Sequence, residues 1–85
     1  MSNQHISLCE AVKNRILQLC NEKDLTINGL ATISGLSPSS VKNILYGKSK
    51  NPKLATIKII CDGLNMSLKD FFDSEEFNNL EQEID

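Results

Sequence analysis

The sequence predicts an all-α fold, a compact domain of five helices, and three observations lead to this prediction. A chain of 85 residues makes one domain at most, and at this size folding hides only about 60–65% of the unfolded surface, which favours locally consistent helices. A serine followed three residues later by an acid, the spacing of a capping box, occurs at Ser7 and at Ser67. Apolar residues recur at helical spacing along the chain, and no strand pattern is found.

The first helix is expected to begin after Ser7 and to end near Lys23. Ser7 can accept a hydrogen bond from an early amide, and Glu10 can reach back to it. Apolar residues then recur on one face of the helix, namely Leu8, Val12, Ile16, Leu19 and Cys20. Polar residues, Lys13 and Asn14 among them, fill the opposite side, so one face should be buried.

Two short helices joined by a tight turn follow, at residues 27–34 and 38–46. Thr26 can cap the first of them, and Gly35 can end it because glycine tolerates the positive φ of a helix C-terminal turn. Ser37 can cap the next helix, with Pro38 at the first helical position, where a missing N–H costs nothing. The turn is too short for the two helices to lie antiparallel.

A loop with the breaker Asn51–Pro52 precedes a fourth helix at 54–64, and Ser67 opens a short fifth helix through Phe72. Beyond this helix the chain is acidic, yet three apolar residues keep a rough helical spacing: Phe77, Leu80 and Ile84. They either pack back on the domain or form a dimer contact. We therefore divide the chain into a flexible N-terminal tail, a folded domain and an acidic extension with a helical pattern, at residues 1–6, 7–73 and 74–85.

The second and third helices have the small and apolar residues of a helix-turn-helix unit. Counted from Ile27, Ala31 is fifth and Gly35 ninth, where they let the helices approach and form the turn. Val41 is fifteenth and Ile44 eighteenth, where they anchor the second helix on the first. The residues after this unit carry the rest of the resemblance that is described below. They are Gly47–Lys48, Asn51–Pro52, Leu54, Thr56–Ile57, Ile60, Leu64, Met66–Ser67–Leu68 and Phe71–Phe72.

In these residues the sequence resembles the Cro and phage-repressor type of helix-turn-helix domain, the XRE-like or lambda-repressor-like family. Two positions depart from the family pattern. Members often have a phosphate-binding glutamine where this chain has Ile27. Many also bury an arginine–glutamate pair where this chain has Cys20 and Leu45. Because loss of one partner alone would leave a buried charge, the paired change fits the alignment, and we expect Cys20 and Leu45 to be in contact.

The resemblance implies a sequence-specific regulator of transcription, a repressor, that binds a double-stranded DNA operator as a homodimer. Helix 38–46 would read base edges in the major groove through Pro38, Ser39, Ser40, Lys42 and Asn43. Phosphate contacts would come from Thr26, Asn28, Tyr46, Lys48, Ser49, Lys50 and Asn51, with a half-buried ring as the alternative for Tyr46. Asn43 can hold adenine with two hydrogen bonds and no arginine is present to hold guanine, so we expect A·T-leaning half-sites.

The overall charge of −2 and the pI near 5.3 argue against nucleic-acid binding when taken alone. The charge is unevenly distributed, however. Residues 37–58 contain five lysines and no acid, whereas residues 59–85 contain eight acids and one lysine. Because binding responds to the local field at the docking surface, the basic segment can attract phosphate despite the negative total.

Other classes of function find less support in the residues. The three cysteines form no Cys-x-x-C motif, and His5 is the one histidine, so we expect packing thiols in a reducing cytoplasm and no metal site. No catalytic set, cofactor motif, small-molecule site or membrane-length apolar run is found, which indicates a binding protein and not an enzyme. The alternative is a protein-interaction module of antitoxin or anti-repressor type with weak or no DNA binding. Ile27 and the acidic extension favour this alternative.

Overall fold

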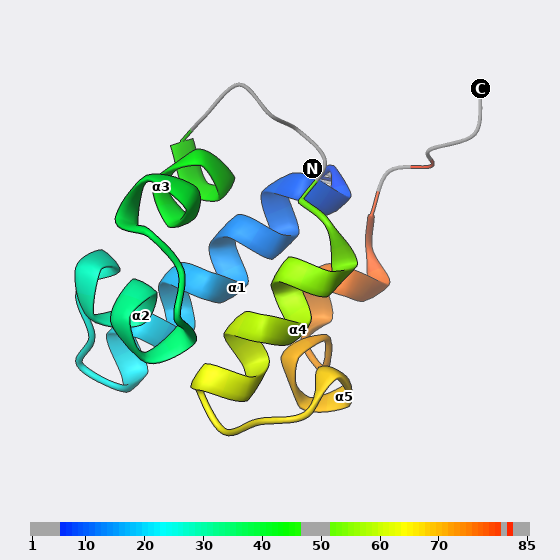
Figure 1. The fold of residues 1–85 in the computed structure, drawn as a ribbon. Helices are drawn as coiled ribbons and strands as arrows, with labels where there is room; N and C mark the ends of the chain where they lie inside the picture. The colour runs from blue at the N-terminus through cyan, green and yellow to red at the C-terminus, as the bar shows by residue number, and fades with distance from the viewer. Residues whose placement is uncertain (1–5, 47–51, 81, 83–85) are drawn as a thin grey trace.

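The computed structural model describes residues 6–46, 52–80 and 82. These residues form five α-helices and one 3-10 turn: α1 (Leu8–Glu22), α2 (Ile27–Ser34), α3 (Pro38–Tyr46), α4 (Leu54–Gly63), α5 (Leu68–Phe71) and η1 (Glu75–Asn78). α1 crosses the middle of the molecule, with α2 and α3 toward one side and α4 and α5 toward the other (Figure 1). The predicted five-helix, all-α fold is confirmed.

Hydroxyl side chains cap four of the helices. In each case the side-chain oxygen accepts a hydrogen bond from the backbone N–H three residues later, at 2.9–3.1 Å, which satisfies an amide that the helix itself leaves unpaired. The four capping residues are Ser7, Thr26, Ser37 and Ser67. These caps fix where α1, α2, α3 and α5 begin.

The turn between α2 and α3 is set by Gly35. Its φ of 69° lies in the left-handed region, which glycine adopts without steric cost. The Leu36 N–H then donates to the Ala31 carbonyl at 2.9 Å, so the last turn of α2 is closed in a Schellman arrangement. Leu36 packs against the core and helps to fix the direction in which the chain enters α3.

All five helices contribute to one hydrophobic core. Phe71 is its largest fully buried side chain, and its neighbours in the buried cluster are Val12, Ile16, Leu19, Cys20, Leu30, Ala31, Val41, Leu45, Ile57, Ile60, Cys61 and Leu64. Cys20 and Leu45 are thus buried in the same cluster, 6% and 3% exposed, while their direct contact stays a prediction. No charged side chain is buried in the described part of the chain.

The C-terminal end of α4 lies against the end of α2. A Cβ atom at Gly63 would lie 2.6 Å from Ser34 Oγ and 2.9 Å from the Ile33 carbonyl oxygen, closer than real Cβ atoms approach. Glycine at this position therefore allows a backbone approach that any other residue would prevent. This approach holds the helix-turn-helix unit against the rest of the core.

The C-terminal segment packs back on the domain through Phe77. The Phe77 ring lies 4.9 Å from that of Phe72 and 6.3 Å from that of Phe71, between ring centroids. Residues 75–78 form a 3-10 turn, and Leu80 forms an isolated parallel bridge with Ile6. Phe77 therefore packs back on the domain, which is one of the two alternatives for this segment. Ile84 lies outside the described residues.

Arg15 of α1 caps the short helix α5. Its Nε donates to the Phe71 carbonyl and its Nη2 to the Asp70 carbonyl, each at 2.7 Å, while Nη1 donates to Gln18 Oε1 at 3.0 Å. A guanidinium suits this position because its donors form a planar fork and its charge complements a helix C-terminus. No local sequence pattern predicts this role of Arg15, since the two carbonyls lie more than 50 residues further along the chain.

Candidate nucleic-acid interface

One face of α3 is buried and the opposite face is exposed. Val41 is fully buried and Leu45 is 3% exposed. Because each residue of an α-helix turns the chain by about 100°, the opposite face carries four side chains, all of them exposed: Ser39, Lys42, Asn43 and Tyr46. We refer to these four residues as the α3 outer face. It combines a hydroxyl, an ammonium, an amide and a phenol, and it contains no acid.

The remaining two residues predicted to contact bases lie at the N-terminal edge of this face. Pro38 is exposed at the first position of α3. Ser40 is exposed too, but its hydroxyl lies 3.0 Å from Ser37 Oγ and its N–H donates to the same oxygen at 3.1 Å. Ser40 therefore takes part in the helix cap. Its role in reading bases stays a prediction, as do those of the other base-contacting residues.

The N-terminus of α2 presents Thr26 and Asn28 to solvent. Thr26 Oγ1 accepts a hydrogen bond from the Gly29 N–H at 2.9 Å, so its own hydroxyl proton stays available to an acceptor such as a phosphate. Ile27, between them, is half-buried and packs against the core. The position at which the family often has a phosphate-binding glutamine thus serves packing in this chain.

Tyr46 ends the α3 outer face and is 63% exposed, so the half-buried alternative for its ring is wrong. The Lys13 ammonium of α1 lies 6.0 Å from the centroid of this ring. The sequence pattern predicts only that Lys13 lies on the polar side of α1, because no local spacing indicates the proximity of two helices. The remaining residues predicted to contact phosphates, Lys48, Ser49, Lys50 and Asn51, lie outside the described residues.

The lysines of the basic segment differ in their surroundings. Lys42 and Lys53 are exposed. Lys58 forms an ion pair with Asp62 one turn further along α4, which compensates its charge. α5 and η1, which contain Asp70, Glu75 and Glu76, lie on the other side of α1 from α3 (Figure 1). Lys42 of α3 is therefore separated in space from α5 and η1, whereas Lys58 and Asp62 on α4 bring the basic and acidic segments into contact.

An apolar hollow of about 180 Å³ lies between the N-terminal ends of α1 and α4. Cys9, Val12 and Ile57 belong to its lining, together with Phe72. Leu8 and Leu54 border it and are 41% and 63% exposed, so large apolar side chains protrude beside an apolar depression.

Two of the three thiols, those of Cys20 and Cys61, are buried, and that of Cys9 is half-buried. Burial raises the pKa of the Cys20 thiol and that of the Cys61 thiol, and the adjacent Asp62 raises the latter further while Lys58 and Arg15 oppose it. A raised pKa keeps a thiol protonated and unreactive at neutral pH. The described residues hold no group of three metal-ligating side chains. None of their helices is both long and apolar enough to span a bilayer.

Comparisons with known proteins agree with this arrangement. A family model described as the Cro/C1-type HTH DNA-binding domain matches residues 15–76. The HTH-type transcriptional repressor RghR of Bacillus subtilis (strain 168) is 39% identical over 57 residues, which are 67% of this chain and 42% of that protein. The chain thus spans about two fifths of the length of this relative.

Solved structures show the same similarity. Prophage Lp1 protein 11 has a TM-score of 0.76 and 36% identity, covering 88% of this chain and 99% of its own. An HTH_3 family transcriptional regulator from Vibrio cholerae has a TM-score of 0.71 and 26% identity, covering 80% of this chain and 38% of its own. The clp gene regulator ClgR from C. glutamicum, with a TM-score of 0.72, 20% identity and 92% and 97% coverage, shares the fold.

Proposed function

Because the chain belongs to the Cro/C1-type helix-turn-helix DNA-binding family, we propose that it binds double-stranded DNA and represses transcription by occupying an operator. The observation that carries this proposal is the α3 outer face, an exposed polar surface without acids on a helix anchored in the core by the buried Val41 and Leu45. The similarity to RghR, which is named as a repressor, supports the direction of regulation.

On this proposal α3 lies in the major groove, whose width of about 12 Å matches the diameter of a helix with its side chains. Asn43 reads adenine with two hydrogen bonds, and Ser39 and Lys42 contact neighbouring base edges. Thr26 and Asn28 donate to phosphates beside the N-terminus of α2, where the helix dipole also favours an anion. Residues 48–51 would contact phosphates beyond the other end of α3.

We further propose that two copies bind a two-fold operator, with the apolar hollow as their contact. A two-fold interface pairs the same patch on both copies, and a protrusion beside a depression makes such a patch self-complementary. Leu54, 63% exposed, is such a protrusion, and it borders the hollow lined by Val12 and Ile57. Sedimentation analysis should detect a dimer that Leu54→Gln weakens. An unchanged monomer–dimer equilibrium in that variant would contradict the assignment of the dimer contact to this hollow.

Binding to a nonspecific duplex across a salt series, measured by fluorescence anisotropy, tests the main proposal. Affinity should fall steeply as salt rises, since each phosphate contact releases counterions from DNA. Selection from random duplexes should then return A·T-leaning sites with two related halves. No binding at low salt would reject DNA recognition and favour an antitoxin or anti-repressor type of module that engages a protein.

A further inference from the structure

Lys13 lies outside the helix-turn-helix unit but next to the C-terminal end of α3. Its ammonium is 6.0 Å from the ring centroid of Tyr46, which belongs to the α3 outer face. Tyr46 is 63% exposed, and the Lys13 side chain beside it is 31% exposed, so solvent reaches both. α1 thereby brings a cation to the edge of the surface that carries the base-reading residues.

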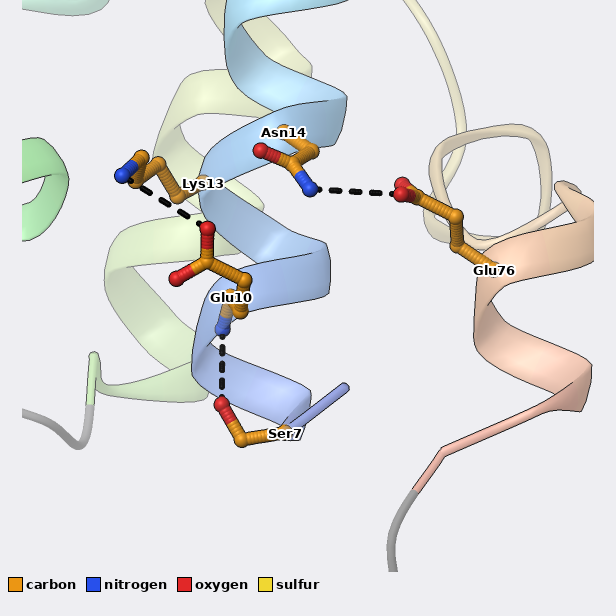
Figure 2. A network of polar contacts seen from close by, with 5 residues as sticks. All are labelled: Ser7, Glu10, Lys13, Asn14 and Glu76. Carbon is orange, nitrogen blue, oxygen red and sulfur yellow. Dashed lines mark hydrogen bonds and ion pairs between the residues drawn. The ribbon is translucent and has the colours of Figure 1, made fainter. Parts of the chain in front are cut away.

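Glu10 holds Lys13 in the free protein. The Glu10 carboxylate lies 3.6 Å from the Lys13 ammonium one turn along α1, and the two side chains are 47% and 31% exposed. Figure 2 shows this pair on one side of α1, with Asn14 on another side donating to Glu76 at 3.2 Å. An exposed ion pair of this kind contributes only about 0–1 kcal/mol, so a stronger anion can replace the carboxylate.

We propose that Lys13 binds a DNA backbone phosphate and that Glu10 competes with this phosphate for the same ammonium. The inference rests on the proposed DNA binding. A helix that fills the major groove has a phosphate chain along each flank, since helix and groove are of similar width. When α3 occupies the groove, a cation beside its exposed end is therefore close to one of these phosphate chains. Lys13 extends the interface from the helix-turn-helix unit to α1.

Salt dependence of binding to a nonspecific 20-bp duplex separates this role from a structural one. One phosphate contact contributes about 0.9 to the slope of log affinity against log salt. Lys13→Gln should reduce the slope by this amount and weaken binding about eight-fold at 0.1 M salt, which is the effect of one released counterion. Lys13→Arg should retain the slope, because it keeps the charge.

Lys69→Gln is the matched control, because it removes the same charge from an exposed lysine of α5, on the opposite side of the molecule from α3 (Figure 1). It should leave the slope unchanged. Glu10→Gln should tighten binding, and this gain should shrink when Lys13→Gln is also present, since the competitor then has nothing to hold. Circular dichroism of each variant should match the parent, since both side chains of the pair are solvent-accessible.

The two proposals fail in different ways. If the parent protein shows no salt-dependent binding, DNA recognition itself is rejected and the role of Lys13 with it. If the parent binds but Lys13→Gln behaves as Lys69→Gln does, DNA recognition stands and the role of Lys13 is overturned. An unchanged affinity in Glu10→Gln would overturn the competition between the carboxylate and the phosphate.

Discussion

Asn43 is the side chain on the α3 outer face whose amide offers both a donor and an acceptor to a base edge. Asn43→Ala should therefore relax specificity at one base pair, at a cost of about 1–3 kcal/mol on the preferred site, and leave nonspecific binding nearly unchanged. Competition between a selected site and the same site with one A·T pair replaced would measure this loss. Equal losses on both duplexes would show that Asn43 supports affinity and not sequence reading.

Gly63 shows how a single residue can fix the approach of two helices. Gly63→Ala should destabilise the fold by about 2 kcal/mol, because crowding against the α2 backbone outweighs the ~1 kcal/mol that alanine gains in helix propensity. Urea unfolding followed by circular dichroism measures the difference. Gly35→Ala is the contrast, since a Cβ there meets nothing within 4 Å and the cost of about 1–2 kcal/mol arises from its φ of 69° alone. A Gly63→Ala variant as stable as the parent would contradict the close approach.

The three cysteines should react in the order of their exposure. Cys9 is half-buried, whereas Cys20 and Cys61 are buried with raised thiol pKa values, so alkylation of the native protein at pH 8 should modify Cys9 first. Mass spectrometry after timed labelling measures the order, and in denaturant the three rates should converge. Faster labelling of Cys61 than of Cys9 would contradict the packing.

The same pKa shifts predict how the free energy of unfolding changes with pH. A buried thiol with a raised pKa in the folded state keeps its proton at pH values at which the same thiol in the unfolded chain has lost it. Stability should therefore be fully retained below the ordinary pKa of 9.0 and decline as pH rises above it. Urea unfolding repeated from pH 7 to pH 10 measures this decline, and Cys61→Ala should reduce its steepness.

At the scale of elements, local sequence chemistry predicted helix boundaries well. Ser7, Thr26, Ser37 and Ser67 were each expected to cap a helix, and each accepts the expected backbone hydrogen bond. The family resemblance was also correct. Such features depend on residues three or four apart, which the sequence displays directly.

Contacts between distant segments were not predictable in this way. Lys13 beside Tyr46 and Glu76 beside Asn14 depend on how helices pack, which no local spacing encodes. The acidic extension has a rough helical spacing in its sequence, but its described residues, 74–80 and 82, contain a 3-10 turn at 75–78. Phe77 is placed there by two other rings and not by helix propensity. Tertiary packing determines the structure of this segment.

The Arg15 cap on α5 is the clearest of these long-range contacts. Arg15→Ala should destabilise the fold by about 2 kcal/mol, because two carbonyls lose charged donors. Arg15→Lys keeps the charge but loses the planar fork, so it should recover less than half of this loss. Gln18→Ala is the control, since it removes the third partner of Arg15 and an exposed hydrogen bond to Glu22 but leaves both carbonyl contacts in place. Thermal unfolding measures all three, and an Arg15→Lys variant as stable as the parent would show that charge alone matters.

At the scale of the whole molecule, α3 lies on one side of α1, and α5 and η1, which contain Asp70, Glu75 and Glu76, lie on the other (Figure 1). Fields from separated charges act over the Debye length, about 20 Å at 20 mM salt and about 7 Å at 200 mM. Distant acids should therefore weaken DNA binding only at low salt.

Neutralising two exposed acids, Asp73→Asn with Glu75→Gln, isolates this field. We expect duplex binding to tighten about two-fold at 20 mM salt and not at 200 mM, because a long-range field is screened whereas a direct contact is not. Anisotropy titrations at the two salt concentrations measure this difference. An effect of equal size at both concentrations would mean that these carboxylates approach the DNA directly. The DNA interface would then include the side of α5 and η1 as well as that of α3.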